Sequence, residues 1–600
     1  MKSSGRSIRL LPGLVCTSAV ALAIVACSTR EGFGKDPPSL LPDPADAGEM
    51  QDAQQPPPNC GIHCSRDLKQ VLDGCEGAET VVKQCSADQG CGNGTCVDAC
   101  TAAALTKGSA GCDFWTVPPI NKVDLTGGCF AAMIANTWDR SVTISAQHGI
   151  DPLDISSAIY TVKQNGQDPV YTRLEGPLSS GEVAIVFFSH DDGYYSDPSA
   201  RCPPTVTPAL LFDPMINGTG ITKAFRITTD APVSAYSIYP YGGAPSQIPT
   251  ATLLLPVSSW TQNYIAVSPD NFGVTKRRRS LQIIANEDDT DVSIRPNVEV
   301  IAAGNIAGAT AGVTQTWKLS KGQVLQFLQR SMTGSPIETT KPVAVFGGSE
   351  CTELPTPYCD VLQQQLPPFE HWGTEYAVVP FAPRIASFSA DIREKVPYTI
   401  VGAVDGTKLT YDPSPPLNAP EMLDAGQSVS FITDQLFVVR SQDAKHPFHV
   451  NVYMTSANYG GGTGRRIAGD ADFVNVPAAA QYLDRYVFFA DFAYPETALT
   501  LVRRKTAKGF MPVELECGGE VGDFQPLGSS GQYEFAWVKL TSGFLPQKFA
   551  KGECGYGRHV ASSDGPFAIT VWGVAPDASY GYVGGTGLRP IHQAKPPVVK

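Results

Sequence analysis

The chain has 600 residues, of which 42% are hydrophobic and 17% are charged, and its formal net charge at pH 7 is −13. This acidic balance argues against nucleic acid or an anionic membrane surface as the main partner, because phosphate binding needs a basic face. At roughly 150 residues per domain, the length allows about four domains. The 57 glycines and 49 prolines favour an all-β chain with many turns.

The N-terminus has the pattern of an export signal. Three basic residues precede a short apolar run that ends in Ala26, and this run is too short and wrongly flanked for a stop-transfer helix. The ending at Cys27 resembles a bacterial lipobox, in which the cysteine is lipidated; a plain secretory signal with an incidental cysteine is the alternative. We predict a lipoprotein signal peptide over residues 1–26 and a palmitate-bearing anchor at Cys27, on the bacterial outer membrane or cell surface.

Two further segments precede the expected β region. Residues 27–59 are acidic and Pro-rich with few apolar residues, so we predict a disordered tether. Residues 60–112 hold eight cysteines, which in an exported chain predicts a small disulfide framework, because so short a segment cannot bury enough core unaided. The pairing stays open. A zinc site at Cys60, His63 and Cys64 is the sharper alternative, although paired C-x-x-C spacing is missing.

Six more cysteines lie in the expected β region. Proximity, and elimination for the last pair, suggest three disulfides: Cys351 with Cys359, Cys517 with Cys554, and Cys129 with Cys202. In the modular arrangement derived next, these bonds would close loops within the second or third, the fourth and the first module.

A proline followed by alternating apolar residues occurs four times. The copies begin at Pro232, Pro342, Pro447 and Pro566, at intervals of 110, 105 and 119 residues. Period-two alternation with β-branched and aromatic residues is a strand signature, and proline is tolerated at the first residue of a strand. We therefore interpret each proline as a strand entrance and each interval as one immunoglobulin-like sandwich, since a propeller blade of about 40 to 50 residues is too short.

Two further markers recur in fixed order before the proline. They are an Asp/Thr turn and strand at 284–294, 404–409 and 496–499, and a Gly-Gln turn at 322–325 and 426–429 with a looser copy at 181–184. Recurrence in the same order indicates an internal repeat. The sequence therefore predicts an all-β fold of tandem β-sandwich modules, at residues 113–250, 251–355, 356–475 and 476–600.

Catalytic signatures are missing from the sequence. It contains no G-x-S-x-G elbow, H-E-x-x-H motif, P-loop or kinase set, so we expect no enzymatic activity and no catalytic or cofactor-binding residue. Calcium is the one exception that the chain allows, because Asp191, Asp192 and Asp197 follow His190 on a Gly-containing loop. An acidic turn between strands is the alternative, since the ligand alternation of a dedicated calcium loop is absent.

Other polar clusters have plainer interpretations. The basic run 276–279 is interpreted as a solvated hairpin turn rather than a polyanion site, and the acidic cluster at 288–291 as a hairpin turn of the repeat. His446 and His449 would not share a strand face, so we place both at the surface rather than in a metal site.

Glycine-rich runs and aromatic residues complete the set of candidates. The runs at 459–464 and 582–587 lack the helix start that a phosphate loop needs, so they are interpreted as linkers. Four aromatic residues on Gly/Pro loops could stack on sugars if exposed, although core or interface packing is the commoner fate. They are Tyr236, Tyr239, Tyr241 and Trp260.

Several short motifs are shared with a known family. They include Gly111–Trp115, Cys129–Asn136, the proline strand at 341–349, the segment from Cys351 through Tyr358 and Gln365 to Gly373, and the closing run Ala578–Ile591. Over about residues 113–592 the chain resembles the IgG Fc-binding protein N-terminal domain family. The resemblance implies an extracellular β-rich module, found in an animal mucus protein and in many bacterial surface proteins. No family contact residue can be matched to a position here, so Fc binding does not carry over.

The sequence thus predicts a lipid-anchored surface protein that acts as a non-catalytic binding or adhesion scaffold for extracellular glycoprotein, glycan or protein ligands. Its other partner is the membrane, through the lipid. A structural envelope protein is one alternative, and a glycan-acting hydrolase with a paired-carboxylate cleft is another. Recognition would lie on loops at the ends of the sandwiches, which a rigid scaffold can position.

Overall fold

The computed structural model describes residues 61–75, 79–121, 126–165, 168–193, 198–270, 272–273, 277–356, 358–385 and 393–599. The chain divides into two units, residues 1–57 and 58–600, and every described residue lies in the second. Strands dominate this unit, as the composition predicts. Within the described ranges, no helix combines the length and apolar character needed to cross a membrane. The predicted signal peptide, Cys27 and tether lie outside these ranges.

The strands form four modules in chain order. The first module contains β6 (Gly111–Thr116), β7 (Phe130–Asn136), β8 (Ile144–His148), β9 (Asp151–Leu153), β10 (Ile159–Asn165), β11 (Asp168–Arg173), β12 (Val183–Ser189), β14 (Phe225–Tyr239) and β15 (Thr250–Leu253). The second contains β13 (Gly220–Lys223), β16 (Thr261–Ile265), β17 (Arg279–Ala285), β18 (Thr290–Ile294), β19 (Gln315–Leu319), β20 (Gln323–Gln329), β21 (Pro336–Glu353) and β22 (Cys359–Gln365).

The other two modules follow the same plan. The third contains β23 (Glu375–Val378), β24 (Val396–Gly402), β25 (Thr407–Asp412), β26 (Met422–Leu423), β27 (Ser428–Thr433), β28 (Phe437–Ser441), β29 (Phe448–Met454) and β30 (Asp472–Asn475). The fourth contains β31 (Leu483–Ala490), β32 (Glu496–Arg504), β33 (Val513–Leu515), β34 (Gly519–Glu520), β35 (Gln525–Leu527), β36 (Tyr533–Ser542), β37 (Leu545–Lys548), β38 (Glu553–Cys554), β39 (Gly557–Ala575) and β40 (Ala578–Val583).

The last strand of each module pairs with the strand that carries or directly follows the repeated proline. β15 pairs with β14, β22 with β21, β30 with β29 and β40 with β39. The sheets of the first two modules therefore end at Leu253 and Gln365, later than the expected boundaries after residues 250 and 355. The third ends with β30 at Asn475.

In three modules the repeated proline lies inside a long strand. These are Pro232 in β14, Pro342 in β21 and Pro566 in β39. The two halves of such a strand have different partners: in β14, residues 225–229 pair with β8 and residues 233–238 with β7. The predicted strand entrance is right only for Pro447, directly before β29. Elsewhere it is wrong, because the strand continues through the proline and changes its partner there, where proline's missing N–H is tolerated.

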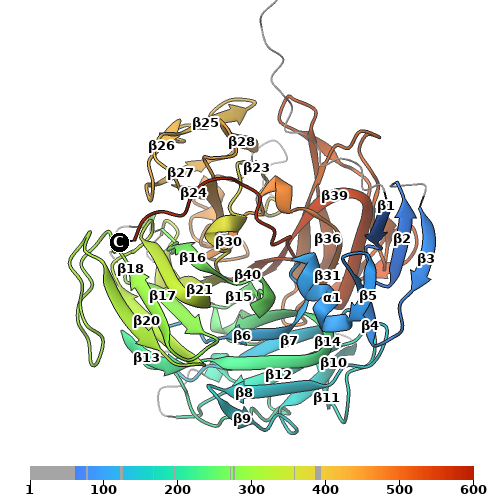
Figure 1. The fold of residues 1–600 in the computed structure, drawn as a ribbon, viewed down its shortest axis with the longest axis horizontal. Coiled ribbons are helices and arrows are strands. Elements are labelled where there is room, and N and C mark those ends of the chain that lie inside the picture. The colour runs from blue at the N-terminus through green and yellow to red at the C-terminus, as the bar shows by residue number, and fades with distance from the viewer. Residues whose placement is uncertain are drawn as a thin grey trace, which may run out of the picture. The chain divides into compact units, whose positions relative to one another are not determined.

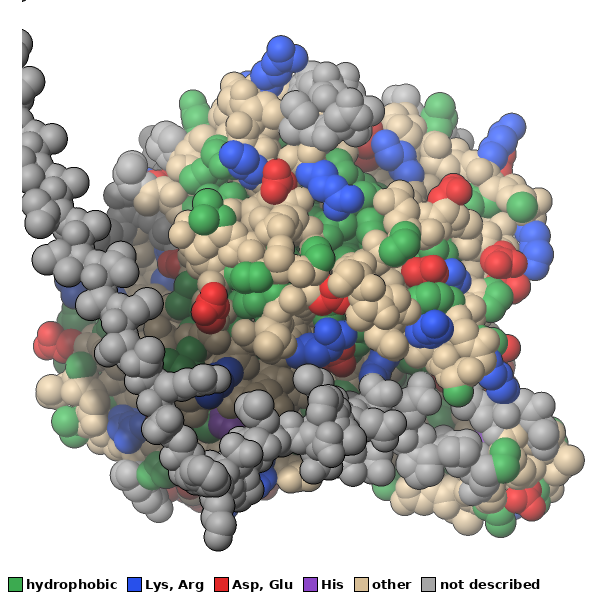
Figure 2. Space-filling view, turned by 90° about the horizontal axis from the view of Figure 1, so that it is seen from above, with side chains coloured by type: hydrophobic (Ala, Val, Ile, Leu, Met, Phe, Trp, Pro, Cys, Tyr) green, Lys and Arg blue, Asp and Glu red, His purple; other side chains and the backbone are tan. Residues whose placement is uncertain are grey.

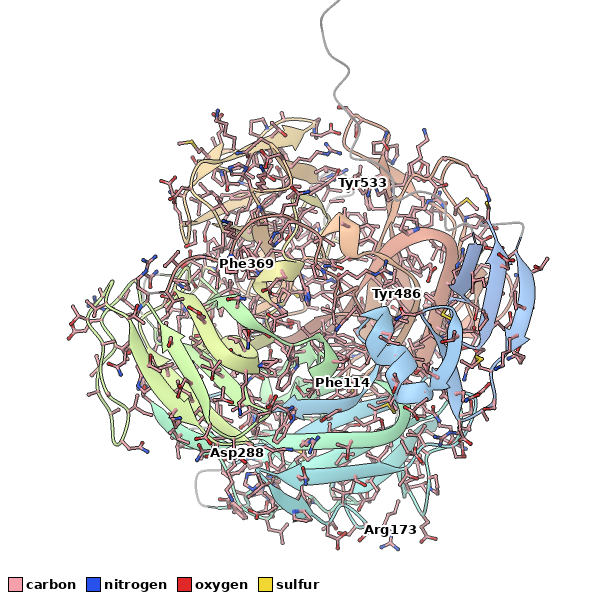
Figure 3. The ribbon with its side chains drawn as sticks, in the orientation of Figure 1. Phe114, Arg173, Asp288, Phe369, Tyr486 and Tyr533 are labelled. Atoms are coloured by element: carbon pink, nitrogen blue, oxygen red, sulfur yellow. A yellow bond between two sulfur atoms is a disulfide. The ribbon has the colours of Figure 1, made fainter. Side chains whose placement is uncertain are left out.

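The Asp-rich turn at residues 286–289 does not join a hairpin. β17 and β18 do not pair with each other but pair with different parts of β21, residues 343–349 and 337–339, so the predicted hairpin is wrong. The carboxylate of Asp288, labelled in Figure 3, accepts a hydrogen bond from the Lys321 backbone N–H at 3.0 Å. The expected third copy at 496–499 begins β32, which pairs with its proline strand as β17 does and is thus a different element.

The four modules are arranged around a shared centre, and their order along the chain follows the ring (Figure 1). The inner strands, which we define as β15, β22, β30 and β40, occupy that centre. β15 contacts β22, β22 contacts β30, β30 contacts β40, and β40 contacts β15. The first and last modules therefore meet, and the ring is closed.

One buried side chain joins all four inner strands. Gln364 on β22 is 2% exposed, and its Nε2 lies 2.8 Å from the Ala251 carbonyl of β15, 3.0 Å from that of Phe473 in β30 and 3.1 Å from that of Gly581 in β40. Its Oε1 accepts a hydrogen bond from the Thr252 hydroxyl at 3.3 Å. The amide thus holds the three other strands to β22 at the point where they converge.

The Cys-rich segment is a disulfide framework, as predicted. It contains β1 (Gly61–Cys64), β2 (Gln70–Gly74), β3 (Thr80–Gln84), β4 (Gln89–Gly92), β5 (Thr95–Asp98) and α1 (Ala99–Thr106). Its bonds join Cys64 to Cys91, Cys85 to Cys96 and Cys100 to Cys112, and Cys75 is also disulfide-bonded. The alternative of a zinc site is wrong, because the thiol of Cys64 is consumed in a disulfide.

This segment covers the seam where the ring closes. Towards the first module, the Lys69 ammonium lies 2.7 Å from the Asp139 carboxylate and 3.1 Å from the centre of the Trp138 ring. Towards the fourth module, the Arg66 guanidinium lies 2.7 Å from the carboxylate of Asp564. The disulfide framework therefore contacts the first and last modules at once.

The C-terminal residues also link modules to one another. After β40 the chain passes over the third module, where the Gln593 N–H donates to the Ala444 carbonyl at 2.8 Å. It then reaches the second module, where the Thr314 hydroxyl donates to the Val599 carbonyl. Residues 588–599 thus connect three modules.

Disulfides also staple the modules internally. The structure joins Cys129 to Cys202, Cys351 to Cys359 and Cys517 to Cys554, the same pairs that the sequence suggests. The Cys351–Cys359 bond closes the connection between β21 and β22 and therefore belongs to the second module.

Replacing Gln364 by leucine should weaken the whole ring. Leucine is similar in size to glutamine but has no amide, so the carbonyls of Ala251, Phe473 and Gly581 lose this donor. We expect the free energy of unfolding to fall by about 3 kcal/mol. Guanidinium unfolding of residues 58–600 measures this loss. Gln532→Leu, at an exposed position, serves as the control, and equal stability of the two variants would contradict the assigned role.

Candidate binding site

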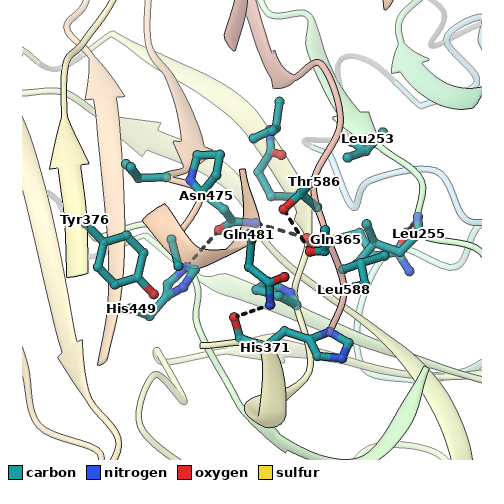
Figure 4. A pocket seen from close by; sticks show the side chains of 17 residues that line it. Leu253, Leu255, Gln365, His371, Tyr376, His449, Asn475, Gln481, Thr586 and Leu588 are labelled. Atoms are coloured by element: carbon teal, nitrogen blue, oxygen red, sulfur yellow. Dashed lines mark hydrogen bonds between the residues drawn. The ribbon is translucent and has the colours of Figure 1, made fainter. Parts of the chain in front are cut away.

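A pocket lies where the four inner strands end. It encloses about 50 Å³, and every module contributes to its wall (Figure 4). The main contributors are Leu253 and Leu255 from the first module, Gln365 and Pro367 from the second, Asn475 and Ala478 from the third, and Val583 and Leu588 from the fourth. We call this the axial pocket. It exists only when the ring is closed.

The wall of the axial pocket carries no formal charge. Among the described residues that line it there is no Lys, Arg, Asp or Glu, and most of the wall is apolar. On the outer face drawn in Figure 2, by contrast, acidic and basic side chains are interspersed among apolar ones. The pocket is therefore chemically distinct from the surface, and it favours an uncharged ligand.

His449 forms the polar part of one wall. It is 2% exposed, its Nε2 lies 3.1 Å from the Asn475 Oδ1, and its ring packs against Trp372 at 5.0 Å between centroids. Burial lowers the pKa of His449 to about 4, so the ring is uncharged at neutral pH. The prediction that His449 is a surface residue is wrong, because the strand β29 that carries it is buried along its whole length.

His371 lines the same pocket and has an unused ring nitrogen. The residue is 6% exposed, and its Nδ1 has no hydrogen-bond partner in the described part of the chain. Burial lowers its pKa to about 4, with the charge of Lys107 acting in the same direction. The Gln481 amide holds the backbone here, with its Nε2 3.4 Å from the His371 carbonyl and 2.7 Å from the Arg589 carbonyl. A neutral imidazole with one free nitrogen therefore lines the pocket.

Buried carboxyl groups gather at the other ends of the inner strands. Asp360 lies in β22 and Asp472 in β30, and burial raises the pKa of both well above its usual range. Burial also raises the pKa of Asp470, beside them, to about 6, and that of Asp491, after β31, to about 6. These groups prefer the neutral form in the folded chain.

The predicted calcium residues are tied to protein partners. Asp191 Oδ1 accepts from the Gly193 N–H at 2.8 Å, and Asp192 Oδ1 lies 2.9 Å from the His190 Nε2 and 3.5 Å from the Arg201 Nε. Asp197 lies outside the described residues. Across the described ranges, no group of three or more His, Cys, Asp or Glu side chains is placed to hold a metal ion. Calcium binding stays a prediction.

The basic run does not form a solvated turn. The Arg278 Nη2 lies 2.6 Å from the Glu350 Oε2, the Arg277 Nε lies 3.3 Å from the Glu353 Oε1, and Arg279 is buried in β17. The prediction is wrong because β21 places two glutamates beside the run, far away in the sequence. Lys276 lies outside the described residues.

The aromatic candidates are structural. Tyr236, Tyr239, Tyr241 and Trp260 are 0%, 3%, 1% and 6% exposed, so none of them offers a face to a sugar. The Tyr236 hydroxyl instead donates to the Val487 carbonyl of the fourth module at 2.5 Å. Tyr236 therefore holds the first and fourth modules together.

The pocket residues escaped the sequence analysis, but a faint signal exists. Each inner strand of the first three modules is followed by a one-turn 3₁₀ helix and an aromatic residue. These turns are η5 (Val257–Ser259) before Trp260, η6 (Phe369–His371) before Trp372 and η8 (Ala479–Gln481) before Tyr482. Aligning the repeats on this turn places His371 and Gln481 at equivalent positions.

The fold and the site together define a disulfide-stapled, all-β protein of four modules with an uncharged pocket between them. The family model described as IgGFc binding protein matches residues 250–573, more than half of the chain. The chain therefore belongs to this family, and the matched residues lie inside the span of the resemblance seen in the sequence.

A human protein supports the same assignment. The chain is similar to the Homo sapiens "IgGFc-binding protein", with 28% identity over 264 residues, which cover 43% of this chain and 4% of that protein. The chain thus corresponds to a small part of the length of this relative. No solved structure matches the chain.

The buried carboxyls should make stability depend on pH. Because the folded pKa of Asp491 is about 6 and its ordinary value is 3.8, its stabilising contribution is present below about pH 4 and is lost as the pH rises through about 6. The free energy of unfolding should fall by about 2 kcal/mol more in the wild type than in Asp491→Asn between pH 4.5 and 7.5. Urea unfolding at the two pH values measures this, with the exposed Asp168→Asn as control; parallel profiles for wild type and Asp491→Asn would refute it.

Proposed function

We propose that this protein is a non-catalytic binding protein of the cell surface, anchored through a lipid on Cys27, which recognises extracellular glycoprotein, glycan or protein ligands. Membership of the IgGFc binding protein family carries the proposal, since both the family and its human relative are named for a binding activity. Fc itself is one candidate ligand among these.

The architecture supports a binding role. A ring of four modules, closed at the centre by Gln364 and at the seam by the disulfide framework, is a rigid support for recognition loops. Disulfides in the first, second and fourth modules suit an oxidising, extracellular setting. The axial pocket adds an uncharged concave site of the kind that anchors small ligand groups.

The anchor can be tested by one substitution. Cys27→Ala should abolish incorporation of labelled palmitate and move the protein out of the detergent phase, because the lipidated thiol is the attachment point. Cys16→Ala, within the predicted signal peptide, is the matched control and should still be labelled. Palmitate uptake by Cys27→Ala would refute the anchor.

Ligand binding can be tested on the folded unit. Residues 58–600, produced by export so that the disulfides form, should bind saturably to one class in a panel of IgG Fc, mucin and glycans on a biosensor. The same chain reduced and alkylated is the control and should lose binding. Repeating the panel with EGTA and with Asp192→Asn tests the predicted calcium site. Silence across the panel from a folded, disulfide-intact sample would contradict the binding function and favour a structural role in the envelope.

A further inference from the structure

The size of the axial pocket limits what can enter it. An engineered apolar cavity of about 150 Å³ holds a benzene molecule. The axial pocket encloses about 50 Å³, so about two non-hydrogen atoms fit inside, by the same scale. Its partly exposed residues Pro367, Val476, Pro477 and Thr586 form a rim through which a larger molecule could present such a group.

The wall selects for a methyl-sized group. Leu253, Leu255, Val583 and Leu588 supply aliphatic surface from the first and fourth modules. No charged side chain among the described residues lines the pocket, so a carboxylate or an ammonium ion would be buried without a counter-charge. The enclosed group is therefore uncharged and partly apolar.

One residue of the pocket wall has a buried polar atom that lacks a hydrogen-bond partner in the described structure. That residue is His371, which is 6% exposed, and the atom is its Nδ1. A buried polar atom without a partner is unfavourable, and a ligand atom that completes it gains affinity. The ring is neutral at physiological pH because burial lowers the pKa of His371 to about 4, so Nδ1 can carry the proton and donate it to an acceptor.

We propose that the axial pocket binds an acetamido group, with its methyl against Leu253, Val583 and Leu588 and its carbonyl oxygen accepting a hydrogen bond from His371 Nδ1. The group is uncharged and carries one methyl and one strong acceptor; its methyl end enters the enclosed space, and its nitrogen lies towards the rim. It occurs on N-acetylated amino sugars and on N-acetylated peptide ends. This inference rests on the proposed binding function and names the chemical group that the site would recognise.

Saturation-transfer NMR with residues 58–600 tests the proposal directly. The probes are N-acetylglucosamine, N-acetylalanine amide, glucose and acetate. We expect saturation of the acetyl methyl in both N-acetyl compounds and none in glucose or acetate. Additional saturation of the sugar ring protons identifies a glycan source, and stronger binding of the amide identifies a peptide source; either result supports the acetamido group.

Three variants locate the signal. His371→Phe keeps a ring but removes the nitrogen and should weaken the methyl signal at least about fivefold, and Ala478→Leu should abolish it by filling the pocket. His148→Phe is the matched control, because His148 also has a buried nitrogen without a partner in the described structure but lies outside the pocket. Thermal unfolding confirms that each variant is folded.

Competition provides a measurement that needs no variant. An excess of acetamide should displace N-acetylglucosamine from the wild-type protein, whereas an excess of acetate should not. The proposal is overturned if acetamide fails to compete, if glucose is saturated as strongly as N-acetylglucosamine, or if folded His371→Phe and Ala478→Leu both keep the wild-type signal.

Failure of this inference is separable from failure of the proposed function. Saturable binding to the panel that Ala478→Leu leaves unchanged would overturn the pocket assignment and keep the binding function. A pocket-dependent acetyl signal together with silence across the panel would support the pocket assignment and contradict the wider function.

Discussion

The amide of Gln364 is the constraint on which the ring depends. Its nitrogen faces carbonyls from three other strands, so those three strands must each place one carbonyl beside Gln364. Each inner strand is in turn fixed by pairing with its proline strand, and in three modules that strand continues through the proline and pairs with different strands on either side of it. A change at the centre therefore affects every module. The axial pocket depends on the same arrangement, because its wall is made of residues from all four modules, Gln364 included.

The number and size of the modules were readable from the sequence because the repeated proline keeps its spacing. Its position within the strand was not readable, because alternation of apolar residues looks the same whether a strand begins at a proline or continues through it. Disulfides between neighbouring cysteines followed from proximity. Arg278 and Glu350, however, are distant in the sequence, and only the pairing of β17 with β21 brings them into contact.

The site was harder to predict than the fold for a physical reason. Its wall is assembled from short segments of four modules, each contributing residues such as Leu253, Ala478 or Val583 that are unremarkable in isolation. His449 was misplaced because a histidine next to a proline on a strand gives no sign of how deeply that strand is buried. The family assignment could be reached from short motifs because these mark the proline strands and their neighbours, the elements that hold the ring together.

Closure of the ring has a consequence for how such chains can grow. In an open array, a duplicated unit adds to one end and leaves the others undisturbed. Here β40 contacts β15, and the Cys-rich segment covers the seam between them, so the closed ring has room for a fixed number of modules. A fifth module would move the inner strands away from Gln364, and the axial pocket would be lost. Lengthening by gene duplication must therefore proceed in whole rings of four, each bringing its own joint and its own pocket.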